Sequence, residues 1–321
     1  MILYQGKKYG CEAGETVLEC LLRQGVAIPY SCRSGVCHGC LMRSVSGTPA
    51  ADSQKGLKPS LVSQNYFLPC LCRTDQDLEI VPPDTAGLRF ETVVVGIDAM
   101  SDAIVRVRLQ RPSGFDYHAG QFLTLYNPQG VGRSYSLASV PVLDPFLEMH
   151  IRLVPNGVVS NWVKHTLKVG DAVVISEAIG NCFYVAGNTE QALLLIGTGS
   201  GLAPLYGIVR DALHSGHQGT IKLYHGSGST AGIYLQQELS RLAQNHPNFH
   251  YVPCVSRSEG GPGIAQGRAT TVALQQNPKL SGWRAYVCGE PTMVTDTSRA
   301  IFLAGASLKE INSDPFIHSK P

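Results

Sequence analysis

The sequence has no long apolar run and no cluster of positive charge. No stretch approaches the roughly 18 apolar residues that a membrane-spanning helix needs, and residues 1–8 lack the basic and apolar regions of a signal peptide. No Lys/Arg run offers a phosphate-binding patch, and the formal net charge is only +2. We therefore expect a cytoplasmic protein that binds neither membrane nor nucleic acid.

Internal repeats and low-complexity tracts are also absent, and the composition is that of a globular protein. Of the 321 residues, 44% are hydrophobic and 16% are charged, which leaves room for two or three domains with real cores. Two breaks divide the chain: a stretch rich in Pro, Gly and Asp at residues 81–87, and the pair Gly187-Asn188. We expect a monomer with domains at residues 1–85, 88–187 and 188–321.

The three segments differ in their expected secondary structure. The first has short strand-like runs at residues 2–4 and 78–81 and a helical apolar spacing at residues 16–25. The second has short β-runs between turn residues, which predicts a barrel or sandwich, at residues 92–95, 103–109, 122–125, 146–153 and 172–175. The third alternates strands with helices, which predicts a parallel sheet, with strands at residues 192–196, 221–224, 249–255 and 285–288 and helices at residues 203–214, 234–245 and 270–276.

Cysteine is the residue type with an unusual distribution. Of the ten cysteines, seven fall in the first quarter of the chain: Cys11, Cys20, Cys32, Cys37, Cys40, Cys70 and Cys72. A secreted disulfide scaffold would be small and would carry a signal peptide. In a cytosolic protein such a concentration indicates a metal site.

The spacing of three of these cysteines is C-x₄-C-x₂-C, and a fourth follows at a distance, giving the set Cys32, Cys37, Cys40 and Cys70. This is the plant-type [2Fe–2S] pattern, in which one tight loop supplies three thiolates. Gly35 and Gly39 let the loop backbone come close to the cluster. A zinc site formed by Cys37, Cys40, Cys70 and Cys72 is the rival interpretation, although it leaves Cys32 unused. Cys72 stays open as the fourth ligand, and Cys11 and Cys20 are interpreted as packing residues.

A second group of motifs lies in the middle segment. The run Arg133, Ser134, Tyr135, Ser136 resembles the R-x-Y-S signature of the ferredoxin–NADP reductase superfamily, although alone it could equally be an ordinary strand. An arginine can neutralise a diphosphate, a tyrosine can stack on isoalloxazine, and a serine can reach the flavin N5 edge. Further matches are Gly180-x-x-Phe183, which resembles the turn closing the barrel, and the FAD diphosphate-binding segment formed by His150, Ile151, Arg152, Gly157, Val158, Val159 and Ser160. Together they favour FAD.

The last segment carries a nicotinamide motif. A buried strand, residues 193–196, precedes a glycine-rich turn and a helix, which can hold a pyrophosphate, at Gly197, Thr198, Gly199, Gly201, Ala203 and Pro204. The spacing is G-x-G-x-G rather than the Rossmann G-x-G-x-x-G, but it resembles the G-T-G-x-G-x-A-P of the same superfamily. Cys288-Gly289 resembles the family's C-G-x-P, where nicotinamide meets flavin; Cys288 is not expected to be a nucleophile. Ser256-Arg257 resembles a coenzyme contact and leaves NADH or NADPH open, with a slight preference for NADH.

In this domain order the chain resembles the reductase components of bacterial multicomponent oxygenases. Its late segments, residues 282–286 and Asp314-Pro315-Phe316, resemble those of the aromatic-ring dioxygenase reductases, especially the naphthalene type. The resemblance implies a β-grasp ferredoxin domain, an antiparallel β-barrel FAD domain and an α/β nicotinamide domain. It implies electron transfer from NAD(P)H through FAD and the cluster to an oxygenase, such as a Rieske-type dioxygenase, or to its ferredoxin. Ser136, Cys288 and Phe316 are then the expected catalytic residues, with Phe316 packed on the flavin face that nicotinamide must occupy. The alternatives are a reductase for a CDP-6-deoxy-glucoseen-type dehydratase and a non-catalytic zinc and nucleotide module.

Overall fold

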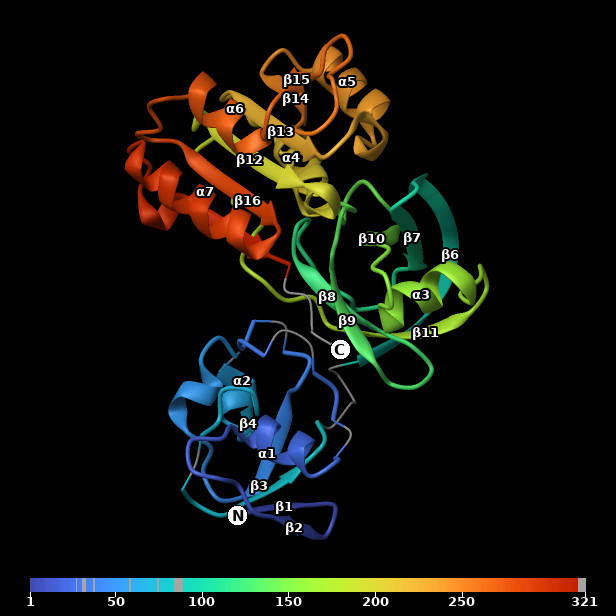
Figure 1. Ribbon diagram of the computed structural model, residues 1–321, viewed down its shortest axis with the longest axis vertical. Helices are drawn as coiled ribbons and strands as arrows, with labels where there is room; N and C mark the ends of the chain where they lie inside the picture. Colours follow the sequence, from blue (N-terminus) through green and yellow to red (C-terminus); the bar gives the residue numbers. More distant parts are fainter. Residues whose placement is uncertain are drawn as a thin grey trace.

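The computed structural model describes residues 1–26, 28–30, 33–36, 38–57, 59–73, 75–83 and 89–316. Three sheets follow one another along the chain (Figure 1). The predicted boundary between the first two domains falls on residues 84–88, outside the described residues. No helix in the described part of the chain has the length and hydropathy to cross a bilayer.

The first sheet has five strands in the order β2-β1-β5-β3-β4. They are β1 (Ile2–Tyr4), β2 (Lys7–Tyr9), β3 (Met42–Ser46), β4 (Tyr66–Phe67) and β5 (Leu78–Val81), accompanied by α1 (Val17–Arg23), η1 (Ala51–Gln54) and α2 (Pro59–Val62). Helix α1 begins after Thr16, which forms a capping box with Glu19. Its apolar face packs into the core, as the spacing at residues 16–25 predicts.

The second sheet is antiparallel, with the order β10-β7-β6-β11-β8-β9. Its elements are β6 (Arg89–Ser101), β7 (Ile104–Gln110), β8 (Phe122–Tyr126), β9 (Gly132–Ser136), β10 (Phe146–Arg152) and β11 (Ala172–Ser176), with α3 (Val158–His165) after β10. A bridge between Leu137 and Met149 links its two edges. The predicted barrel is therefore confirmed, because the sheet closes on itself around an apolar core.

The third sheet is parallel, with the order β15-β14-β13-β12-β16-β17. Its strands are β12 (Leu193–Thr198), β13 (Ile221–Ser227), β14 (Phe249–Val255), β15 (Ala265–Gln266), β16 (Arg284–Gly289) and β17 (Ile311–Pro315). Its helices are η2 (Gly199–Gly201), α4 (Leu202–His214), η3 (Thr230–Gly232), α5 (Gln236–Asn245), α6 (Ala269–Gln276), α7 (Pro291–Leu303) and η4 (Leu308–Glu310). The strand order reverses between β12 and β16, and ligands bind at such a switch point, beyond the carboxyl ends of the strands.

The observed elements differ from the predicted ones at two places that matter for the site. The helix expected from residue 234 begins at Gln236, because Leu235 has a left-handed backbone, with φ of 56°. Strand β17 was not predicted: residues 311–315 pair in parallel with β16 and bring the end of the chain to the switch point.

Candidate functional site

The cysteine-rich segments meet in the first domain. Cys40 and Cys70 are buried in one core, at 5% and 7% exposure. Gly35, with φ of +78°, lies so close to Leu71 that an added Cβ would overlap that side chain. The loop after Cys32 therefore packs against the segment of Cys70, as a four-thiolate site requires. Cys32 and Cys37 lie outside the described residues, and no group of three or more metal-ligating side chains gathers among the described ones.

Cys72 lies deeper than Cys70 in the same core. It is fully buried in the apolar core, and its thiol is hydrogen-bonded to Ser53 and the backbone of Ala50. Burial raises the pKa of the Cys72 thiol above its usual value. A thiol that is fully enclosed and already bonded to Ser53 and Ala50 is less accessible to a cluster, which favours Cys70 as the fourth ligand.

Helix α1 is tied directly to this segment. The backbone N–H of Val17 donates to Cys72 O at 2.8 Å, and that of Leu18 donates to Pro69 O at 3.1 Å. The first-turn N–H groups of a helix have no partner within it, and here they fix the backbone on both sides of Cys70.

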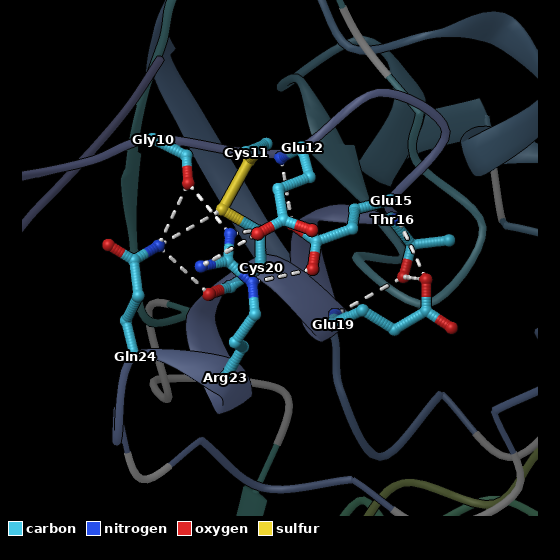
Figure 2. A network of polar contacts seen from close by, with 9 residues as sticks. All are labelled: Gly10, Cys11, Glu12, Glu15, Thr16, Glu19, Cys20, Arg23 and Gln24. Carbon is cyan, nitrogen blue, oxygen red and sulfur yellow. Dashed lines mark hydrogen bonds and ion pairs between the residues drawn. A yellow bond between two sulfur atoms is a disulfide. The ribbon is translucent and has the colours of Figure 1, made fainter.

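The same helix carries a disulfide between Cys20 and Cys11, with a Cα–Cα distance of 5.0 Å (Figure 2). The interpretation of both residues as packing cysteines was therefore wrong. The loop before α1 folds back on the helix, where Arg23 binds Glu15 in a bidentate ion pair, at 2.7 and 2.8 Å, and donates to Gly10 O at 3.0 Å. The spacing of Cys11 and Cys20 in the sequence does not show that the loop before α1 folds back on the helix.

A crevice of about 140 Å³ separates the first domain from the barrel. Its walls include His38 and Gly39 of the cysteine loop and Thr124 and Tyr126 of β8. The Thr124 hydroxyl lies 3.5 Å from the hydroxyl of Ser134 in β9. The cysteine loop therefore faces the strand pair that carries the R-x-Y-S motif.

Strand β9 holds all four residues of that motif. Tyr135 is half-buried against the barrel core, and burial raises its pKa. The Arg133 guanidinium donates to Gly132 O at 2.7 Å and remains partly exposed. Ser136 is buried at the end of the strand. An aromatic ring, a cation and a hydroxyl on one strand fit the FAD contacts expected of them.

Only some side chains of the segment predicted to bind the FAD diphosphate are accessible to a ligand. Ile151 points into the barrel core, His150 is buried and bonded to other side chains, and Arg152 is exposed. Helix α3 begins after Gly157, where an added Cβ would overlap Ser160 Oγ, and that hydroxyl accepts from Val154 N at 3.2 Å. Val158 is exposed, whereas Val159 is buried. An anion would therefore be held here by the backbone N–H groups of the first helical turn.

The glycine-rich turn after β12 is built by close backbone contacts. Gly199 has φ of +55°. Gly201 lies against the Cys288 carbonyl, and a Cβ on Gly289 would meet Thr198 Oγ1. A Cβ on Gly197 would strike Leu205 and the backbone of Gly201. Ala203 and Pro204 are buried in α4, so their contribution is to the packing of the turn.

Three segments converge beside this turn. Gly197, Cys288 and Asp314 are neighbours in register on β12, β16 and β17. Ser136 Oγ donates to Asp314 Oδ2 at 2.8 Å, which joins the barrel to the parallel sheet. The backbone N–H of Phe316 donates to Gly289 O at 2.7 Å. The three expected catalytic residues thus lie around one point.

Asp314 was not predicted as a site residue, although it belongs to the Asp314-Pro315-Phe316 segment that resembles the family. It is 7% exposed, and burial raises its pKa to about 6, an effect that the bond from Ser136 partly opposes. Cys288 is fully buried with its sulfur 3.7 Å from that of Cys182, and burial raises its pKa well above the usual value. A protonated Cys288 thiol agrees with the expectation that it is no nucleophile.

Ser256 and Arg257 directly follow β14. The backbone N–H groups of Ser256 and Arg257 donate to Ser227 O and Gly228 O at 3.1 and 3.0 Å. The Arg257 guanidinium lies against Gly228. Both residues are exposed and close to the segment after β13, where the far half of a dinucleotide would lie.

Family models match each of the three sheets. The 2Fe-2S iron-sulfur cluster binding domain matches residues 2–75, the oxidoreductase FAD-binding domain residues 94–184, and the oxidoreductase NAD-binding domain residues 195–299. The protein thus has the cofactors FAD and a [2Fe–2S] cluster and the coenzyme NAD(P)H.

Whole-length relatives share the same arrangement. A Ralstonia ferredoxin–NAD(P)⁺ reductase component of naphthalene 1,2-dioxygenase/salicylate 5-hydroxylase systems is 34% identical over 96% of this chain and 95% of its own. A Yersinia pestis CDP-6-deoxy-L-threo-D-glycero-4-hexulose-3-dehydrase reductase is 29% identical over 95% and 94%. The crystal structure of an Amycolatopsis cytochrome P450 reductase has a TM-score of 0.71 at 30% identity and 98% coverage of both chains. The chain belongs to the NAD(P)H-dependent flavin and iron–sulfur reductases that include the reductase components of oxygenase systems.

Proposed function

We propose that this reductase delivers its electrons to an oxygenase component, or to the ferredoxin that serves one. The observation that carries the proposal is the convergence of Ser136, Cys288 and Phe316 at the switch point, with the cysteine loop across a crevice from β8, the strand that pairs with the motif strand β9. When bound, FAD supplies the step between a two-electron hydride donor and the one-electron cluster.

The side chains have distinct parts in this proposal. Arg133 and the first turn of α3 hold the FAD diphosphate, and Tyr135 lies against the flavin ring. Ser136 and Asp314 place a hydroxyl and a carboxyl where hydride arrives. The turn at residues 197–201 holds the coenzyme pyrophosphate, Cys288 and Gly289 border the nicotinamide, and Ser256 and Arg257 contact the adenosine half.

The cluster ligands in this proposal are Cys32, Cys37, Cys40 and Cys70. The burial of Cys40 and Cys70 in one core, and the hydrogen bonds of the Cys72 thiol to Ser53 and Ala50, support this set. We place the domains at residues 1–85, 88–187 and 188–321, and we propose that the protein works as a monomer in the cytoplasm.

The test is an assay of the purified reductase with separate acceptors. We expect NADH or NADPH to reduce cytochrome c through the enzyme, and an oxygenase component or its ferredoxin to be reduced at a rate that supports product formation. Reduction of a deoxysugar dehydrase, with no transfer to any oxygenase or ferredoxin, would replace the proposed acceptor. A colourless protein without iron or flavin would contradict the proposal altogether.

A further inference from the structure

A chain of buried polar side chains crosses from the barrel to the parallel sheet. On β10 the apolar residues Leu147, Met149 and Ile151 point into the barrel core, so Glu148 and His150 point outward. The ring nitrogens of His150 lie 3.0 Å from Glu148 Oε1 and 3.2 Å from the hydroxyl of Tyr234. Glu148, His150 and Tyr234 are only 6%, 3% and 3% exposed.

Tyr234 lies next to the segment that is proposed to bind the coenzyme. It directly follows η3 and the segment that leaves the carboxyl end of β13, the edge at which dinucleotides bind to such sheets. Its ring lies edge-on between two imidazoles, with centroids 5.3 Å from His150 and 5.3 Å from His225. Tyr234 therefore joins the coenzyme segment to the flavin-domain strand β10.

The nucleotide-domain end of this chain has its own partner. His225 is fully buried on β13, and its Nδ1 lies 3.2 Å from the hydroxyl of Tyr251. Burial and the nearby His150 lower the pKa of His225 to about 3, so its ring is uncharged at neutral pH. The Tyr251–His225 contact stays within one domain, whereas the Tyr234–His150 contact crosses between two.

Because these side chains are polar, their contacts favour a role in fixing the relative position of the two domains rather than only in holding them together. Buried polar groups cost free energy unless their partners are met in good geometry, and an apolar patch would hold two domains together without that demand. A second crossing pair lies on the other side of Tyr206: Arg210 of α4 binds Asp144 with two bonds of 2.8 and 2.9 Å. Directional bonds of this kind are satisfied in one relative position of the domains.

We propose that Glu148, His150 and Tyr234 form a positioning chain, which links the coenzyme segment after β13 to strand β10 and so sets the approach of nicotinamide to flavin. His150 then acts through Tyr234 and Glu148 rather than by touching FAD. The inference rests on the proposed function, in which the turn at residues 197–201 binds the coenzyme pyrophosphate.

The test compares two matched variants, Tyr234→Phe and Tyr251→Phe. Each removes one hydroxyl that lies 3.2 Å from a histidine Nδ1, but only the first removes a contact between domains. In stopped flow at saturating NADH, and likewise with NADPH, we expect Tyr234→Phe to reduce the flavin about fivefold more slowly, the loss of one buried hydrogen bond. Tyr251→Phe should stay within about twofold of the wild type. Both variants should keep their FAD, and enzyme reduced by dithionite should pass electrons to cytochrome c at the normal rate.

A second measurement does not depend on turnover. Addition of NAD⁺ to the flavin-loaded protein should slow amide hydrogen exchange in β10 of the wild type and of Tyr251→Phe, but not of Tyr234→Phe. Normal flavin reduction and normal β10 protection in Tyr234→Phe would overturn the positioning chain, and equal losses in both variants would do so too, by assigning the effect to general packing. A wild-type flavin that neither coenzyme reduces would instead overturn the proposed function and, with it, this inference.

Discussion

Replacement of Asp314 by asparagine should stabilise the protein at high pH while it weakens the chemistry. Burial raises the pKa of this carboxyl from 3.8 to about 6, so the folded state disfavours the ionised form. That difference corresponds to about 3 kcal/mol. Because an acid with a raised pKa destabilises the fold above that pKa, the cost is fully present at pH 8. It falls to about half near pH 5, as the folded state takes up its proton.

The asparagine variant keeps an oxygen that can accept the hydrogen bond from Ser136, but it cannot ionise. We therefore expect its free energy of unfolding to exceed that of the wild type by about 3 kcal/mol at pH 8 and by about half as much at pH 5. The assay is guanidinium unfolding at both pH values. Stopped-flow flavin reduction with NADH should lose its pH dependence near 6 in this variant. A stability difference that is absent, or that does not change between pH 8 and pH 5, would refute the reasoning.

Five other substitutions test the cluster ligands, the acceptor side, the flavin site and the disulfide. Cys70→Ser should abolish the visible absorbance of the cluster, because a hydroxyl is a poor ligand for iron, whereas Cys72→Ser should leave the iron content nearly unchanged; the opposite pattern would make Cys72 the ligand. Arg33 is exposed in the cysteine loop, where it can contact an acceptor protein. Arg33→Glu should therefore slow transfer to the protein acceptor in a salt-dependent way and leave ferricyanide reduction intact, and equal losses with both would count against this docking role. Phe316→Ala should change the rate of flavin reduction or the preference between NADH and NADPH while FAD stays bound; an unchanged rate and preference would leave Phe316 only a structural role. Cys11→Ser should lower the free energy of unfolding by about 2 to 3 kcal/mol in non-reducing buffer, since a short loop loses its cross-link, and dithiothreitol should remove the difference from the wild type.

Much of the fold could be predicted because most of its helices and strands have a recognisable local sequence pattern. Short strand-like runs between turn residues predicted the barrel, and the alternation of strands and helices in the last segment predicted the parallel sheet. Strand β17 had no such signal: residues 311–315 are mostly polar and form a strand only because β16 offers an edge beside them. Tertiary pairing, rather than propensity, creates that element.

The candidate site was predictable where a short motif carries its own geometry, and not where distant segments meet. The turn at residues 197–201 has its shape in its glycines. Asp314 has significance only because Ser136, 178 residues earlier, lies 2.8 Å away. Likewise, Glu148 and Tyr234 carry no motif, and the pattern that placed His150 in the FAD segment does not show that its side chain is bonded to these two residues.

The backbone contact between Gly201 and the end of β16 leaves no room for side chains where the coenzyme is proposed to bind. The two segments proposed to border the coenzyme, the turn after β12 and Cys288-Gly289, touch without intervening side chains. Close-packed backbone of this kind does not open by small side-chain rearrangements. The turn and the end of β16 are therefore held together as one unit of the parallel sheet, with no space for a side chain between them. An alanine at Gly201 would in consequence push the turn away from Cys288 and Gly289.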